Sequence, residues 1–142
     1  MSKIYVPKKV DKGVAEAGKW VDSEDDAGIF YGSYKVRFMD PHSQKDELQK
    51  KQLWSKHGCN NSKEKDFYKR MAVSLAYMAV LDWKLPSDPD DKAYTPPKFD
   101  QKTALEFFDD EDNRHILIDV ARKASDNANF QSDDIVSDTT KN

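Results

Sequence analysis

The spacing of apolar and polar side chains predicts a β-hairpin over residues 19–38. A first short strand carries Trp20 and Val21, residues 23–28 form a polar turn, and the second strand alternates with a period of two. Its apolar positions are Phe30, Tyr34, Val36 and Phe38, and the side chains expected on the other face are Tyr31, Ser33, Lys35 and Arg37. Gly32 interrupts the apolar positions, which indicates a β-bulge.

Helical patterns follow the hairpin. Residues 41–56 form a polar helix that ends before Gly58, and its few apolar side chains mean that it packs weakly or packs on another protein. Ser62 is a suitable cap for a second helix that runs to about Trp83. The run from Met71 to Leu81 is apolar on nearly all sides, which places this helix at the centre of the core.

Two shorter helices are predicted nearer the C-terminus, after a proline- and aspartate-rich loop over residues 84–99. The first begins at Asp100 or Thr103, and the second follows a cap at Asp112 or Asn113. The apolar stripe of the second helix is Ile116, Leu117, Val120, Ala121 and Ala124. The predicted core is Phe30, Val36, Phe67, Met71, Leu75, Met78, Trp83, Leu105, Phe108, Ile116, Leu117 and Val120.

These elements predict an α+β fold that is mainly α, with a small N-terminal β-hairpin packed on a bundle of about four helices and disordered ends. Residues 1–18 are expected to form a flexible arm, residues 19–130 a single domain and residues 131–142 a disordered acidic tail. The chain has 142 residues, of which 37% are hydrophobic and 35% are charged. Because this composition is more polar than usual, we expect a core of roughly 100 residues and polar ends that do not pack.

Charge and cysteine content limit the classes of function. The net charge of -3 disfavours nucleic acid as a partner, since phosphate binding needs a clustered basic face. The single cysteine, Cys59, excludes an internal disulfide and fits a reducing compartment. No apolar run approaches the roughly 20 residues of a membrane span, and no apolar stretch follows the first charges as in a signal peptide. We therefore expect no membrane partner and a cytoplasmic location.

Candidate chemistry is sparse. His57 and Cys59 are the only close His/Cys pair, and a zinc site needs about four such ligands. The acidic turn that begins at Asp22 fails the calcium-loop pattern, because Ala27 and Ser33 stand where glycine and glutamate are needed. The chain also lacks a glycine-rich phosphate-binding motif. We therefore expect no cofactor and no enzymatic activity, and a protein that works by binding other proteins.

Two sets of side chains are candidates for partner contact. A tryptophan on an otherwise polar helix is a suitable interface anchor, and Trp54 has Leu48 and Leu53 as apolar neighbours on that helix. Alternation places a second set on the outer face of the strand, which consists of Tyr31, Lys35 and Arg37.

Short motifs occur along the chain in a distinctive order. They are Tyr34-Lys35-Val36-Arg37-Phe38 in the strand, Ala79-Val80-Leu81-Asp82-Trp83 at the end of the buried helix, Tyr94-Thr95-Pro96 in the loop, Thr103-Ala104-Leu105-Glu106-Phe107-Phe108 in the next helix, and Asn129-Phe130 before the polar tail. This order resembles that of tail assembly chaperones of long-tailed bacteriophages, over residues 19–130 or so. The sequence departs from the family pattern between Pro41 and Lys65, where its segment is longer and more charged.

The resemblance implies a protein that binds the aggregation-prone tape measure protein and helps recruit tail tube subunits in the host cytoplasm, with self-association as a further interaction. Two other binding functions remain open at this point. One is a structural virion protein, such as a minor tail or connector component, which presence in the purified particle distinguishes. The other is a small inhibitory protein directed at a host target, although a net charge of -3 is feeble for mimicry of nucleic acid.

Overall fold

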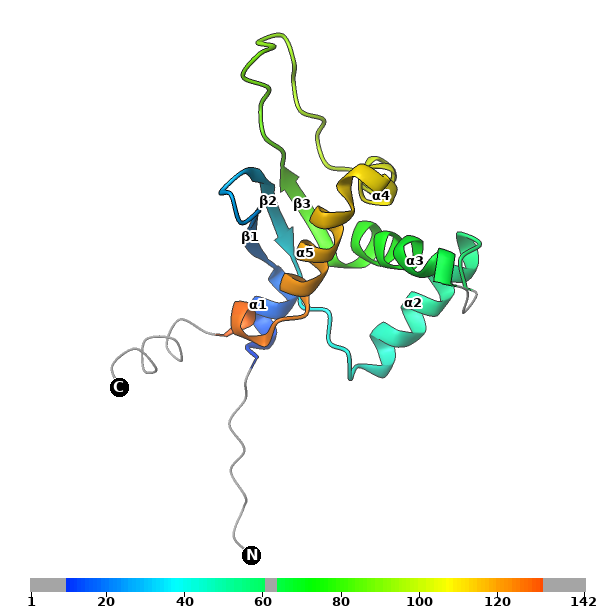
Figure 1. The fold of residues 1–142 in the computed structure, drawn as a ribbon. Coiled ribbons are helices and arrows are strands. Elements are labelled where there is room, and N and C mark those ends of the chain that lie inside the picture. The colour runs from blue at the N-terminus through cyan, green and yellow to red at the C-terminus, as the bar shows by residue number, and fades with distance from the viewer. Residues whose placement is uncertain (1–9, 61–63, 132–142) are drawn as a thin grey trace, which may run out of the picture.

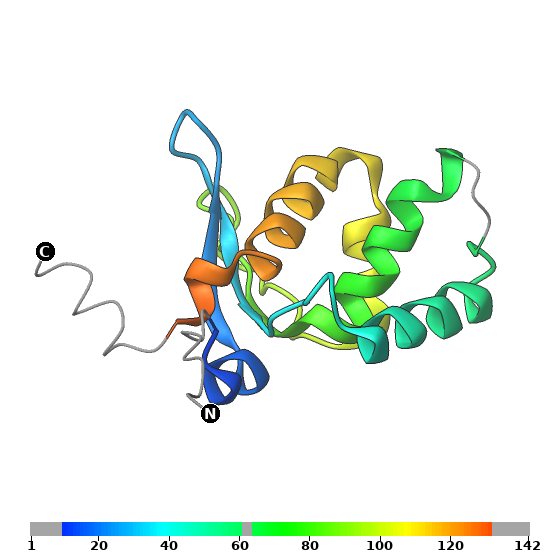
Figure 2. The ribbon, with the colours of Figure 1, turned by 90° about the horizontal axis from the view of Figure 1, so that it is seen from below.

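A three-stranded antiparallel sheet with helices packed on one face forms the protein (Figures 1 and 2). The structure, a computed structural model, describes residues 10–60 and 64–131. The strands are β1 (Lys19–Glu24), β2 (Phe30–Val36) and β3 (Val80–Lys84), in the order β1-β2-β3. The helices are α1 (Lys12–Ala17), α2 (Gln44–Lys56), α3 (Phe67–Ser74), α4 (Gln101–Asp109) and α5 (Arg114–Ala124). The predicted α+β class with a mainly helical content is confirmed.

The predicted hairpin is present, and Gly32 lies in a bulge as expected. Asp22 pairs with Ser33 and Glu24 with Phe30, so one residue of β1 faces two residues of β2. Gly32 has a φ of 116°, a value that side chains with a Cβ rarely adopt. The bulge shifts the alternation by one residue, so Phe30 is exposed rather than in the core and Tyr31 turns inward. The prediction that Phe30 belongs to the core and the prediction that Tyr31 lies on the outer face are therefore wrong.

The third strand replaces the end of the predicted buried helix. Helix α3 ends at Ser74, a π-helical turn η2 (Leu75–Ala79) follows, and β3 then pairs with β2 through Tyr34 opposite Trp83. A run that is apolar on all sides fits a buried strand as well as a buried helix. Pairing with β2 satisfies the backbone groups on one side of that strand, which explains why the helix does not continue. The proposed cap at Ser62 lies outside the described residues.

Residues 10–18 belong to the fold, so the prediction of an arm over residues 1–18 is wrong for this part. Asp11 caps α1 by accepting hydrogen bonds from the backbone N–H groups of Gly13 and Val14. The Asp11 N–H donates to the carbonyl of Phe130 at 2.9 Å, and the Phe38 N–H donates to the carbonyl of Ala15 at 3.1 Å. A helix of six residues is held by such tertiary contacts rather than by its own sequence pattern. The predictions for residues 1–9 and 132–142 lie outside the described residues.

The core lies between the sheet and the helices that cover it. Helix α5 packs on β1 and β2, and α4 packs on α5 and on the π-helical turn. Most of the predicted core is buried, namely Val36, Leu75, Met78, Trp83, Phe108, Ile116, Leu117 and Val120. Met71 and Leu105 are half-buried, whereas Phe67 is 48% exposed and is not a core residue. Tyr34 and Phe130 are among the largest fully buried side chains, although the predicted core omitted them.

The remaining helix and loop predictions need small changes of boundary. Ser43 caps α2, so this helix begins three residues later than residue 41, and Asp100 caps α4 through the Thr103 N–H.

The loop between β3 and α4 projects from the body (Figure 1), and the Trp83 indole N–H donates to the carbonyl of Pro97 at its base. A short 3-10 turn η3 (Glu111–Asn113) precedes α5, and another, η4 (Asn127–Phe130), follows it. None of the helices in the described ranges is long and apolar enough to cross a membrane.

Candidate partner-binding site

Helix α2 lies at the edge of the molecule beside α3, and little apolar surface attaches it there (Figure 2). Leu48 is 60% exposed, and only Leu53 and Trp54 among its apolar side chains are half-buried. The local sequence nevertheless makes a stable helix, because Ser43 Oγ accepts the Asp46 N–H and Lys56 lies in the last turn. The helix must therefore be held in place by a few polar contacts.

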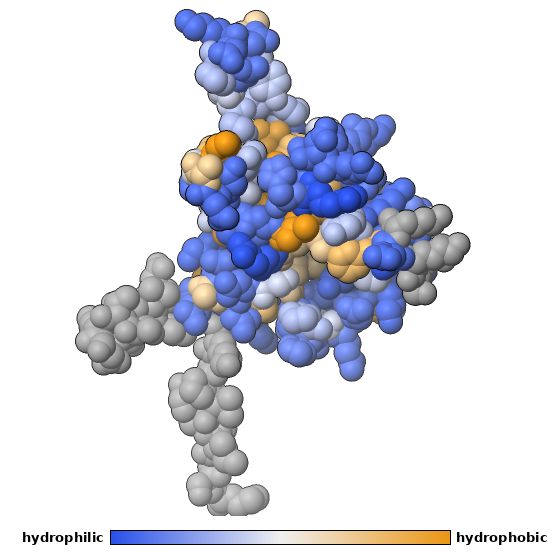
Figure 3. Space-filling view, viewed as in Figure 1, coloured by the Kyte–Doolittle hydropathy of each residue, from blue (hydrophilic) through white to orange (hydrophobic). Residues whose placement is uncertain are grey.

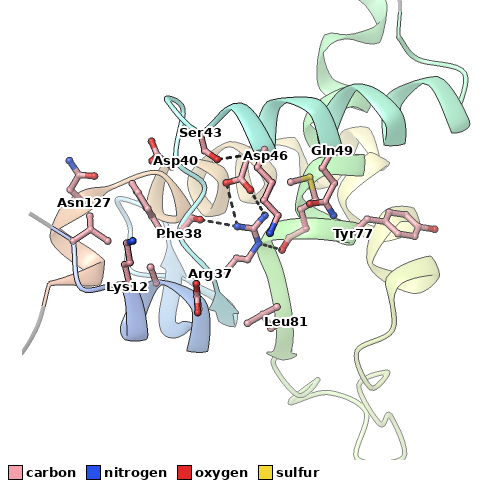
Figure 4. A pocket seen from close by; sticks show the side chains of 15 residues that line it. Lys12, Arg37, Phe38, Asp40, Ser43, Asp46, Gln49, Tyr77, Leu81 and Asn127 are labelled. Carbon is pink, nitrogen blue, oxygen red and sulfur yellow. Dashed lines mark hydrogen bonds and ion pairs between the residues drawn. The ribbon is translucent and has the colours of Figure 1, made fainter.

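The first of these contacts is an ion pair between Arg37 and Asp46 (Figure 4). Arg37 Nη2 lies 3.2 Å from one carboxylate oxygen of Asp46 and Nη1 lies 3.4 Å from the other. Arg37 Nε also donates to the carbonyl of Met78 at 3.0 Å, and Asp46 is buried. Arg37 was predicted to face outward and contact a partner, but its side chain connects β2, the π-helical turn and α2 within the chain.

The second contact is the indole of Trp54, near the other end of α2. Its Nε1 donates to Ser74 Oγ at 2.9 Å and to the carbonyl of Arg70 at 3.0 Å. The Arg70 guanidinium carbon lies 5.8 Å from the centre of the indole ring. The sequence predicted Trp54 as an interface anchor, and the structure places it half-buried between α2 and α3 with its indole N–H bonded within the chain.

Between these two helices lies an apolar cavity of about 470 Å³, which we call the α2–α3 groove. The C-terminal end of α5 closes its third side. It is lined by Met39, Lys50, Trp54, Phe67, Arg70, Met71, Ser74, Leu75, Ala121 and Ser125. Phe67 is 48% exposed and therefore lies at the open side, while Met39 and Leu75 are buried. Because Trp54 and Ser74 satisfy each other, the inner wall offers mainly apolar surface.

The charge around the α2–α3 groove differs from that of the rest of the chain. Residues 44–60 and 64–74 contain seven Lys or Arg against four Asp or Glu, a net charge of +3. The whole chain carries -3, so the remaining residues carry -6. Lys50 and Arg70 line the groove itself, and its lining residues in the described part of the chain include no carboxylate.

A second and larger cavity, of about 970 Å³, lies between α1 and α2, and we call it the α1–α2 cleft (Figure 4). Its charged lining consists of Lys12, Glu16, Arg37, Asp40, Lys45 and Asp46, which balance in sign. Figure 4 shows Arg37 and Asp46 directed toward each other in its wall, whereas the phenol of Tyr77 points away. Much of its polar lining is therefore engaged in holding α2 on the sheet.

The six predicted partner residues do not form one surface. Trp54 lines the α2–α3 groove, Arg37 lines the α1–α2 cleft, and Leu48 and Leu53 line neither. Leu53 packs against the core, and Leu48 stays on the solvent side of α2. Sequence reasoning missed Met39, Ala121 and Ser125 as groove residues, and it assigned Phe67 and Met71 to the core. One feature of the sequence could have indicated the groove. Helix α2 has few apolar side chains, so it cannot cover the apolar side of α3 that faces it.

The two remaining predicted residues lie on the hairpin. The Tyr31 hydroxyl donates to Asp25 Oδ2 at 2.9 Å, and its ring lies edge-on to His115 of α5 with 4.7 Å between centroids. Hydrogen bonding from the Ile29 N–H, and then from Tyr31, lowers the pKa of Asp25. Lys35 lies between Trp20 and Asp82 in the neighbouring strands, on the sheet face opposite the helices. Tyr31 therefore holds the hairpin turn on α5, and Lys35 is half-buried on the open face.

The surface of the protein is mainly hydrophilic, with a few exposed apolar side chains. Figure 3 shows hydrophilic residues over most of this face, including the loop between β3 and α4, with apolar residues at the hairpin turn and in a few separate places over α5 and the helices beside it. The exposed large apolar side chains include Ile29 and Phe30 at the hairpin turn and Phe67 at the α2–α3 groove. Phe67 lines the α2–α3 groove, and Leu81, which is 40% exposed, lines the α1–α2 cleft.

The described residues offer little for metal or nucleophilic chemistry. No three His, Cys, Asp or Glu side chains within residues 10–60 and 64–131 are grouped so that they could hold a metal ion. Burial raises the pKa of the Cys59 thiol, which disfavours the thiolate that a nucleophile or a metal ligand needs. His57 Nε2 is buried without a hydrogen-bond partner, and the ring lies 4.8 Å from that of Tyr77. The His57/Cys59 pair therefore adds no candidate site.

Comparison of the chain with protein-family models, with curated proteins and with solved structures gives no match. The features of this protein that bear on its function are therefore the groove, the charge around it and the order of motifs in the sequence.

Proposed function

We propose that the protein is a phage tail assembly chaperone that binds a helical segment of the tape measure protein in the α2–α3 groove, by contact and without catalysis. The observation that carries the proposal is the groove itself, an apolar cavity between two helices with an exposed phenylalanine at its open side. Grooves of this kind accept the apolar face of an amphipathic helix. The resemblance of the motif order to that family supplies the identity of the partner.

The side chains of the groove suit a partner that exposes many similar segments. Met39 and Met71 line it, and methionine adapts to differently shaped apolar side chains because its unbranched chain is flexible. A tape measure protein is long and helical, so a chaperone that covers it must bind several related stripes. The proposal includes recruitment of tail tube subunits, for which surfaces outside the groove remain available.

The proposal is tested by co-expression with the longest helix-rich protein encoded nearby in the same genome, followed by co-purification. We expect Phe67→Ser to weaken binding about tenfold or more, because an exposed aromatic side chain at a groove is a typical hot spot. Leu48→Ser is the matched control, since Leu48 is also exposed and apolar but does not line the groove. Thermal unfolding of both variants checks that each remains folded.

The outcomes separate the competing functions. Loss of binding with Leu48→Ser alone would place the site on the solvent face of α2, as the sequence predicted. Detection of the chain in purified particles by mass spectrometry would favour a structural virion protein. Absence from the particle together with absence of binding would contradict the chaperone function and favour a host-directed binding protein.

A further inference from the structure

We propose that the α2–α3 groove selects amphipathic helices in which acidic side chains flank the apolar stripe. This inference rests on the proposed function, because it describes the chemistry of the segment that occupies the same groove. The expected occupant is a helix whose charge is complementary to that of the groove.

The lining of the groove is the first observation. Lys50 and Arg70 are its charged members, they come from the two helices that form its walls, and no carboxylate accompanies them among the described lining residues. Lys50 Nζ lies 3.9 Å from Glu47, whose side chain is 47% exposed. The Lys50 side chain is 19% exposed, but 3.9 Å is a long separation for an ion pair with a half-exposed partner, so the pair contributes roughly 1 kcal/mol or less and a partner carboxylate can replace Glu47 at little cost.

The wider charge distribution is the second observation. Residues 44–60 and 64–74, which contain the two helices that form its walls, carry +3 in a chain whose other residues carry -6. A helix with basic flanks would meet like charge at the groove, whereas an acidic flank meets opposite charge there. The acidic remainder of the chain also disfavours binding of the same helix elsewhere on the molecule.

The third observation is the contrast with the α1–α2 cleft, which holds three basic and three acidic side chains. Charges of both signs in one cavity give no preference for a partner of either sign. Of the two cavities, only the apolar α2–α3 groove therefore has an excess of basic side chains. An apolar surface flanked by basic side chains is what an amphipathic helix with acidic flanks requires.

The test uses the full chain and two synthetic amphipathic helices as probes. The two peptides carry the same apolar stripe of leucine and phenylalanine, and they differ only in having glutamate or lysine beside it. We expect the glutamate peptide to bind about tenfold more tightly than the lysine peptide at low salt, with the difference decreasing as salt is added. Equal affinity, tighter binding of the lysine peptide, or no binding of either peptide would overturn the inference.

A matched pair of variants separates the groove from the general charge of α2. Lys50→Glu is expected to reduce the preference for the glutamate peptide about tenfold, whereas Lys51→Glu, at an exposed position that does not line the groove, changes it less than about twofold. Equal effects of the two variants would mean that net charge alone selects the peptide, which would overturn the assignment to the groove. Thermal unfolding confirms that both variants fold.

Failure of this inference is distinguishable from failure of the proposed function. If Phe67→Ser weakens binding of the tape measure protein but the peptides show no charge preference, the groove binds its partner through apolar contact alone. If Phe67→Ser has no effect on the tape measure protein, the proposed function itself fails at this site.

Discussion

The two cavities beside α2 differ in a way that size does not reveal. The α1–α2 cleft is larger, but its wall contains the Arg37–Asp46 pair and charges of both signs. The α2–α3 groove is smaller, and it exposes Phe67 beside methionine and leucine side chains. Polar groups that already bond each other gain little from a partner, whereas exposed apolar surface gains by being covered. The cleft therefore positions α2, and the groove that this position creates is the better binding surface.

The largest loss of stability is expected for a side chain that both holds α2 in place and lines the α2–α3 groove. Trp54→Ala removes one wall of the groove and the hydrogen bond to Ser74, so we expect a loss of roughly 2–4 kcal/mol in the free energy of unfolding. Chemical denaturation measures this, and partner binding should be lost as well. Trp20→Ala, on the open face of the sheet, is the control and should cost roughly 1–2 kcal/mol, because Trp20 is 40% exposed and its ring lies under Lys84 Nζ at 4.8 Å. Equal losses would mean that α2 is not held through Trp54.

A second variant tests whether the ion pair in the α1–α2 cleft maintains the α2–α3 groove by holding α2 in position. Asp46→Ala leaves Arg37 without its carboxylate, and we expect a loss of about 1–3 kcal/mol in stability. Partner binding should weaken although Asp46 does not line the groove. Glu47→Ala removes an acid from the same helical turn without breaking this pair, and it should cost less than about 1 kcal/mol. Unchanged partner binding with Asp46→Ala would show that the two cavities are independent.

A smaller effect concerns α5, which forms the third side of the groove. Burial alone raises the pKa of Asp119, but hydrogen bonds from Ser23, Lys123 and Arg122 outweigh it, so the folded-state pKa lies below the ordinary value of 3.8. A carboxyl with a lowered folded-state pKa contributes stability above its unfolded pKa, and this contribution is lost as pH falls through the folded-state pKa. Unfolding of Asp119→Asn followed from pH 7 to pH 3 should therefore show a smaller acid-dependent loss of stability than the native chain. An identical pH profile would contradict this role.

Local sequence patterns were sufficient to predict the elements whose turns and caps are formed by residues within the element itself. The hairpin follows from its alternation, the bulge from Gly32, and the start of α4 from Asp100, whose side chain caps it. Elements that depend on distant partners could not be predicted in this way. Helix α1 is held by contacts with Phe38 and Phe130, and β3 exists because β2 offers an unpaired edge.

The candidate site was predicted only in part, for the same physical reason. The scarcity of apolar residues on α2 correctly indicated a helix with weak packing, and it drew attention to Trp54. The pattern could not show that Trp54 turns toward Ser74, because that bond joins residues 20 positions apart. Phe67 was assigned to the core since apolar side chains are usually buried, and its exposure becomes visible only when α2 and α3 are placed side by side.

Methionine methyl NMR tests most directly whether the partner occupies the α2–α3 groove rather than the α1–α2 cleft. Met39 and Met71 line the groove, and Met78 lines the cleft, so selectively labelled methyl groups report on the two cavities in one experiment. On titration with the co-purifying tape measure segment, the methyl signals of Met39 and Met71 should shift while that of Met78 stays in place. A shift of Met78 with Met39 and Met71 unchanged would contradict the assignment of the groove as the binding site.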